Sequence, residues 1–97
     1  GYRVSPTEVG ELLLQCPGVA EAVVFGLPDD ALGYKIRAVL VLAKEISVQD
    51  IINHCKAEAP LYLIPQEIFF RPAFPRTASG KIDRPRVIEE SKKENGQ

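Results

Sequence analysis

The sequence contains no tryptophan and no methionine, and it has one histidine and two cysteines among its 97 residues. Cys16 and Cys55 each fall on the apolar stripe of an expected helix, so both are interpreted as small core residues. His54 has no other ligand-type residue at a suitable spacing on a shared face, and a metal site needs clustered ligands. We therefore expect no bound metal, and this cysteine usage fits a reducing cytoplasm.

The sequence also lacks a long apolar run and an excess of positive charge. No run approaches the roughly 20 residues that span a bilayer, so no membrane span is expected. The 12 basic and 13 acidic residues give a net charge of −1, which argues against a nucleic-acid binder. Basic residues do gather between positions 71 and 86, where Asp83 is the single acidic residue: Arg71, Arg76, Lys81, Arg84 and Arg86. This strip favours a small anionic partner, and a plain solvated surface is the alternative.

A chain of 97 residues is one domain with one modest core. It leaves little room for a deep cavity that could enclose both a nucleotide and a second substrate. If the protein handles such substrates, we expect another domain to supply most of the pocket.

Local patterns predict a small α+β domain in the order helix, strand, strand, helix, strand, loop, helix. Capping residues Ser5 and Ser47 begin the first two helices, and each helix carries apolar residues at i, i+3, i+4 and i+7. Three strands are predicted, at residues 19–27, 34–42 and 66–71. The last helix is expected to begin after Asp83. These elements favour a three-stranded, mostly antiparallel sheet flanked by helices. Residues 89–97 are expected to form a frayed polar tail.

The segment from Pro75 to Arg84 is the most informative part of the chain. It is a loop of small residues that presents one lysine, Lys81, directly after a glycine. Gly80 permits backbone angles that other residues avoid, and Thr77 and Ser79 can hydrogen-bond to the loop's own backbone. The lysine ammonium is a compact point charge with three donors, which suits a carboxylate or a phosphate.

Two other interpretations of this loop were considered. A phosphate-binding P-loop requires a glycine five positions before Gly80 and a serine or threonine after the lysine. Those positions hold Pro75 and Ile82, so the P-loop is rejected. The residues alone leave the second alternative open, in which Lys81 is an ordinary solvated lysine.

The loop closely resembles the closing motif of the adenylate-forming superfamily, which includes acyl-CoA synthetases, peptide-synthetase adenylation domains and luciferases. The opening segment, residues 1–9, is similar to the segment that follows that family's interdomain hinge. Other parts of the chain also match in order and spacing: residues 23–29, Gly33, residues 37–42 and residues 64–70. The resemblance covers about residues 1–88, without the large N-terminal domain and the hinge residue. Gly10 and Tyr34 depart from the family pattern, in which an acidic and a polar residue are usual.

The resemblance implies the mobile C-terminal domain of an AMP-forming acyl-CoA synthetase. A carboxylate would attack the α-phosphate of ATP to give acyl-AMP and pyrophosphate, and the thiol of CoA would then displace AMP. In the first step Lys81 would reach the acyl carboxylate and the nucleotide, with Thr77, Ser79 and Gly80 supporting the loop. After a domain rotation, the pantetheine channel would be faced by the opening segment: Gly1, Tyr2, Arg3 and Ser5. An anion-binding patch is expected from Arg76, Arg84 and Arg86.

Further expectations follow from the same resemblance. The partner is the large N-terminal domain of the same chain, and Mg²⁺ would accompany ATP there rather than on this domain. The isolated fragment should be inactive, and a lysine acetyltransferase is a candidate modifier of Lys81. Two alternatives stay open: a carrier-protein thiol could replace CoA as the acceptor, or the chain could be a non-catalytic regulatory or docking module. Nothing in the sequence says which carboxylic acid is activated.

Overall fold

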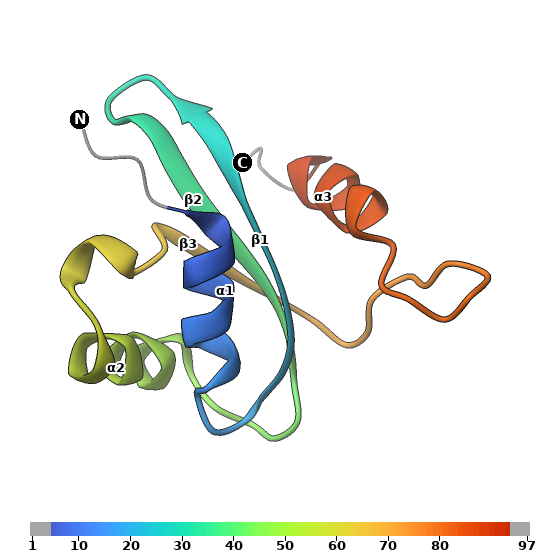
Figure 1. Ribbon diagram of the computed structural model, residues 1–97, viewed down its shortest axis with the longest axis horizontal. Coiled ribbons are helices and arrows are strands. Elements are labelled where there is room, and N and C mark those ends of the chain that lie inside the picture. The colour runs from blue at the N-terminus through green and yellow to red at the C-terminus, as the bar shows by residue number, and fades with distance from the viewer. Residues whose placement is uncertain (1–4, 94–97) are drawn as a thin grey trace.

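The computed structural model describes residues 5–93, which form a three-stranded sheet with helices on both faces (Figure 1). The predicted order of elements is confirmed, with a short 3-10 helix, η1, before the last strand. The elements are α1 (Pro6–Leu14), β1 (Val19–Asp29), β2 (Gly33–Leu42), α2 (Val48–Glu58), η1 (Leu61–Leu63), β3 (Glu67–Arg71) and α3 (Arg84–Lys93).

The sheet has the strand order β1-β2-β3. The long pair β1–β2 is antiparallel, as the short loop predicts, whereas the shorter pair β2–β3 is parallel. A parallel pair needs a crossover connection, and α2 with η1 provides it. The register between β1 and β2 shifts between Val19 and Glu21, which leaves Ala20 as a bulge residue on the edge strand.

One face of the sheet packs against α1 and α2, which lie together on the same side in Figure 1. Val9 and Leu13 of α1 and Ile51 and Cys55 of α2 are completely buried there against β2. At roughly 25 cal/mol per Å² of apolar area removed from water, these side chains provide the main stabilisation of this layer. The helical spacing of the apolar residues therefore identified this core from the sequence.

The predicted caps are present at both helix starts. The Ser5 hydroxyl accepts a hydrogen bond from the Glu8 backbone N–H at 3.4 Å. Ser47 and Asp50 form a complete capping box, because each side chain accepts from the other's backbone N–H. A cap of this kind stabilises a helix by about 1 kcal/mol, so the polar residues at these positions fix where α1 and α2 begin.

The opposite face of the sheet carries a second core beneath α3. It consists of Val23, Phe25 and Leu27 of β1, Val39 of β2, Phe74 of the following loop and Val87 of α3. Both faces of β1 are therefore covered, as its apolar composition predicts.

The expected polar tail is corrected by the structure, because α3 continues through Lys93 and includes residues 89–93. Ser91, which the sequence places in the tail, is 1 % exposed. A contact from the sheet holds it there, as described below. Residues 94–97 lie outside the described part of the chain.

Candidate functional site

Lys81 is exposed on a tight hairpin between β3 and α3. The backbone N–H of Thr77 donates to the carbonyl of Lys81 at 2.8 Å, and Gly80 N–H donates to the carbonyl of Thr77 at 2.9 Å. Gly80 has φ +91°, a value at which other residues are strained. This is the pattern of a three-residue hairpin loop with glycine at its left-handed position. The segment between β3 and α3, which contains this hairpin, projects away from the sheet beside the start of α3 (Figure 1).

The Thr77 hydroxyl bonds to the loop's own backbone as the sequence predicts, whereas the Ser79 hydroxyl contacts the Thr77 hydroxyl. Their oxygens lie 3.0 Å apart, and Thr77 Oγ1 also accepts a hydrogen bond from the Lys81 backbone N–H at 3.3 Å. The predicted role of these residues in supporting the loop therefore has a geometric basis. The peptide that carries Lys81 is fixed by contacts, while its long side chain extends into solvent.

The hairpin stems lead directly into packed structure. Arg76 and Ile82 form an isolated antiparallel bridge, and Asp83 N–H donates to the carbonyl of Pro75 at 2.9 Å. Ile82 packs against the second core. Asp83 Oδ1 accepts from the Arg86 N–H at 3.3 Å, which caps the start of α3 as predicted. Lys81 is therefore two residues from a helix start whose position the core determines.

The three arginines expected to form an anion-binding patch have different surroundings in the structure, and two of them are paired with glutamates. Arg76 forms an ion pair with Glu21 of β1, and Arg86 pairs with Glu90 one turn later in α3 at 3.2 Å. Arg84 instead lines an open groove of about 350 Å³ between α1 and the edge of β1.

Gly1, Tyr2 and Arg3 lie outside the described residues, so their expected place beside a thiol channel stays a prediction.

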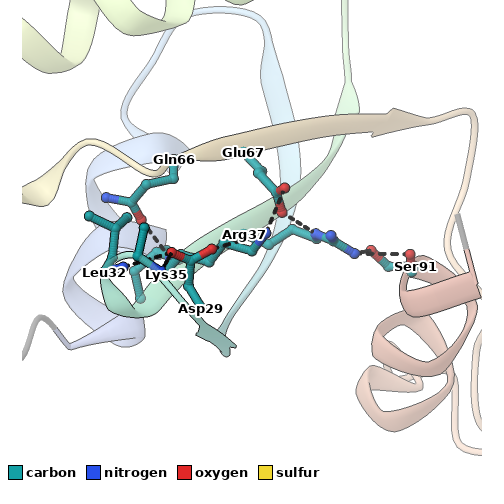
Figure 2. Close-up of polar contacts among 9 residues, drawn as sticks. Asp29, Leu32, Lys35, Arg37, Gln66, Glu67 and Ser91 are labelled. Carbon is teal, nitrogen blue, oxygen red and sulfur yellow. Dashed lines mark hydrogen bonds and ion pairs between the residues drawn. The ribbon is translucent and has the colours of Figure 1, made fainter. Parts of the chain in front are cut away.

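Sequence reasoning missed a buried polar network that links the sheet to α3. Arg37 stands on the face of β2 that becomes polar toward the start of the strand, yet its side chain is 0 % exposed. Its Nε donates to Glu67 Oε1 of β3 at 2.7 Å, and its Nη1 donates to the Ser91 carbonyl and hydroxyl oxygens at 3.0 and 3.1 Å (Figure 2). The guanidinium also lies 4.6 Å from the Phe69 ring centroid. The signal in the sequence was a single arginine, Arg37, within the apolar run of residues 36–42, which could have indicated a buried ion pair.

Glu67 is the carboxylate at the centre of this network. Lys35 Nζ approaches its Oε2 at 3.1 Å and also lies 3.8 Å from Asp29. Burial alone would raise the pKa of Glu67, but hydrogen bonds and charges from Arg37 and Lys35 outweigh burial and hold this pKa below its usual value. Glu67 is thus ionised at neutral pH, and the network ties β2, β3 and α3 together.

The two departures from the expected family pattern, Tyr34 and Gly10, differ in their packing. The Tyr34 ring covers Gly26 on the neighbouring strand, where a Cβ would clash with the tyrosine ring and hydroxyl oxygen. A Cβ at Gly10 of α1 would make an ordinary contact of 3.6 Å with Val24. Both sites lie on the α1 side of the sheet, whereas the Lys81 hairpin adjoins the α3 side.

The described residues 5–93 bring no three His, Cys, Asp or Glu side chains into a group that could hold a metal ion. Within that same range, no helix has the length and apolar character needed to cross a membrane. Cys16 and Cys55 are both buried, free thiols, and burial raises the pKa of each. These groups therefore belong to the core rather than to a reactive site.

Residues 8–81 match the AMP-binding enzyme C-terminal domain family, including the hairpin up to Lys81. The chain belongs to this family. The match ends at the lysine and spans the first core, the sheet and the loop.

Relatives of this AMP-binding C-terminal domain are ligases and synthetases. It is 38 % identical over 93 residues to the oxalate–CoA ligase of Saccharomyces cerevisiae, covering 94 % of this chain and 17 % of that protein. A Mycobacterium tuberculosis fatty acyl CoA synthetase structure matches with a TM-score of 0.81 at 34 % identity, over 93 % of this chain and 18 % of that one. The chain thus spans less than a fifth of the length of these relatives.

A third relative was solved with an adenylate bound. The o-succinylbenzoate CoA synthetase of Bacillus subtilis, in complex with its acyl-adenylate intermediate, matches with a TM-score of 0.77 at 38 % identity. The match covers 90 % of this chain and 18 % of that chain. The fold expected from the sequence is thus found in solved members of the family.

Proposed function

We propose that this chain is the C-terminal domain of an ATP-dependent acyl-CoA synthetase and that Lys81 is its adenylation lysine. The observation that carries the proposal is an exposed lysine on a braced hairpin, at the position where the family match ends. The relatives are CoA ligases of about six times this length, which supports a large partner domain holding the ATP and acid sites.

In the proposed first step, a carboxylate oxygen attacks the α-phosphorus of ATP, and the bond to pyrophosphate breaks. Lys81 supplies positive charge beside the reacting carboxylate and phosphate, where negative charge accumulates. In the second step, the thiolate of CoA attacks the acyl carbonyl and AMP leaves. The domain turns between the two steps, so that Lys81 serves the first and the opening segment, Gly1 to Ser5, serves the second.

The test separates the two half-reactions in the full-length enzyme. Lys81→Ala should lower acyl-AMP formation by roughly 10²–10³-fold, the usual loss for one preorganised electrostatic contact. Thioester formation from supplied acyl-AMP should be retained. Lys56→Ala, an exposed lysine of α2 on the other side of the sheet, is the matched control and should leave both rates unchanged. Equal loss of both half-reactions in Lys81→Ala would contradict the rotation.

Several finer assignments belong to the same proposal. The CoA-ligase relatives favour CoA over a carrier-protein thiol, and thioester assays with each acceptor would distinguish them. Mg²⁺ would enter with ATP in the partner domain. The free buried thiols suit a reducing compartment, so we place the enzyme in the cytoplasm.

Acetylation of Lys81 by a lysine acetyltransferase would remove its charge and stop the first step. Lys81 is exposed, as such an enzyme requires. Mass spectrometry of the full-length protein after treatment with an acetyltransferase and acetyl-CoA tests this, and an unmodified Lys81 would contradict it.

A further inference from the structure

The internal bonds of the Lys81 hairpin fix its shape, but they do not fix its direction relative to the sheet. The bonds between Thr77, Gly80 and Lys81 all lie within five residues of one another, so none of them joins the tip of the hairpin to the sheet. Ile82 anchors one stem in the second core, and a contact between the hairpin tip and another element would further restrict where the lysine points.

The Arg76 side chain contacts both β1 and the tip of the hairpin. Arg76 Nη2 donates to Glu21 Oε2 of β1, while its Nη1 reaches the carbonyl oxygen of Gly80 at 3.5 Å. The Gly80 carbonyl belongs to the peptide bond that precedes Lys81. A single rigid guanidinium thus links the sheet to the backbone that carries the lysine.

The position of Glu21 in β1 suits this contact. It directly follows the bulge at Ala20 on an edge strand, and such bulges redirect the side chains beside them. Val23, two residues along the same face, is buried in the second core under Phe74 and Val87. The Glu21 carboxylate therefore stands at the margin of a packed face, with a side chain that is 25 % exposed.

We propose that Glu21 is a positioning residue for the adenylation step, acting through Arg76 to aim the Lys81 hairpin. This inference rests on the proposed role of Lys81. The pair contributes little to the stability of the domain, because its arginine is 45 % exposed and exposed pairs are weak. Its effect is on geometry, to which catalysis is far more sensitive than stability is.

The experiment uses the full-length enzyme with three variants: Glu21→Gln, Lys81→Ala and the control Glu58→Gln. Glu58 is an exposed glutamate at the end of α2, across the sheet from the hairpin. Glu21→Gln should lower kcat for acyl-AMP formation roughly tenfold, a smaller loss than the roughly 10²–10³-fold expected on removing the lysine. KM for ATP and the rate of thioester formation from supplied acyl-AMP should stay within about twofold of wild type.

A second measurement on the 97-residue chain reports the hairpin itself. In Glu21→Gln, amide hydrogen exchange at Gly80 and Lys81 should speed up, while exchange in β2 and α1 and the melting temperature stay as in Glu58→Gln. A Glu21→Gln enzyme with unchanged adenylation kcat and unchanged exchange at Gly80 would overturn the positioning role. Parallel loss of both half-reactions with a lowered melting temperature would also overturn it, since that is the signature of a merely structural residue.

These outcomes are separate from those of the proposed function. If Lys81→Ala retains full adenylation, the lysine assignment fails whatever Glu21 does. If Lys81→Ala is inactive in adenylation and Glu21→Gln is not impaired, the lysine assignment stands and the positioning role alone is refuted.

Discussion

Replacing Arg37 with alanine should loosen α3 from the sheet. Arg37 is 0 % exposed and bridges three elements, through Glu67 on β3, through Ser91 on α3 and through the Phe69 ring (Figure 2). Truncation removes the charge and also leaves a cavity. The buried Ser91 carbonyl oxygen loses the hydrogen bond from Arg37. Glu67 loses its ion pair with Arg37 and keeps the one with Lys35.

The expected loss follows from these contacts. Removing one partner of a buried ion pair costs about 3–5 kcal/mol, and Glu67 keeps a side-chain exposure of 26 %, which favours the lower part of this range. We therefore expect a decrease of about 3–4 kcal/mol in the free energy of unfolding. For a domain of this size that decrease corresponds to a fall of roughly 12–30 °C in melting temperature.

Thermal and urea unfolding followed by circular dichroism would measure this effect on the 97-residue chain. Arg86→Ala is the matched control, because Arg86 also pairs with a glutamate but has a side chain that is 64 % exposed. The control should lose about 0.3–0.5 kcal/mol. Similar losses in Arg37→Ala and Arg86→Ala would refute the reasoning, since the buried network would then contribute no more than a surface pair.

Three further predictions concern single positions. Glu67 has a lowered pKa in the folded state, so the stabilisation that it contributes is present above the ordinary glutamate pKa and is lost as pH falls through the folded value. Urea midpoints measured from neutral pH into the acid range should therefore decline, and the decline should be less steep in Glu67→Gln. Gly26→Ala should cost about 1–3 kcal/mol in urea unfolding because of the Tyr34 ring, and Tyr34→Ser in the same chain should recover part of it. Gly80→Ala places a side chain at φ +91°, which costs about 1–2 kcal/mol locally, and should slow acyl-AMP formation while the β2 amides keep their hydrogen-exchange protection.

Local sequence signals were sufficient for the helix starts and for the loop that presents Lys81. Ser5, Ser47 and Asp83 mark helix starts through hydrogen bonds to residues only three positions away, so no tertiary information is needed to find them. The same holds for Gly80 and Thr77, whose contacts close within the hairpin. A motif whose geometry is set by its own residues can be predicted from those residues.

Long-range contacts were not predictable in this way. Alternation along β2 shows that Arg37 and Val39 share a face, but it does not show that α3, more than 40 residues later, covers that face. The parallel pairing of β3 likewise depends on where α2 and η1 return the chain. The polar tail was wrong for the same reason, since Ser91 is held in α3 by a strand residue 54 positions away.

The domain combines a packed interior with an exposed lysine, Lys81, that it does not enclose. Two unit charges 4 Å apart attract by about 1 kcal/mol in bulk water and by about 4 kcal/mol at an effective dielectric constant of 20. Lys81 is exposed on its hairpin, so in the isolated chain it falls nearer the first limit. Stabilising an adenylation transition state by the roughly 2.7–4 kcal/mol of a preorganised contact requires the second. Under the proposed assignment, Lys81 becomes catalytic only when another protein surface covers it and excludes water, and the proposed Glu21–Arg76 link would present its charge to such a surface.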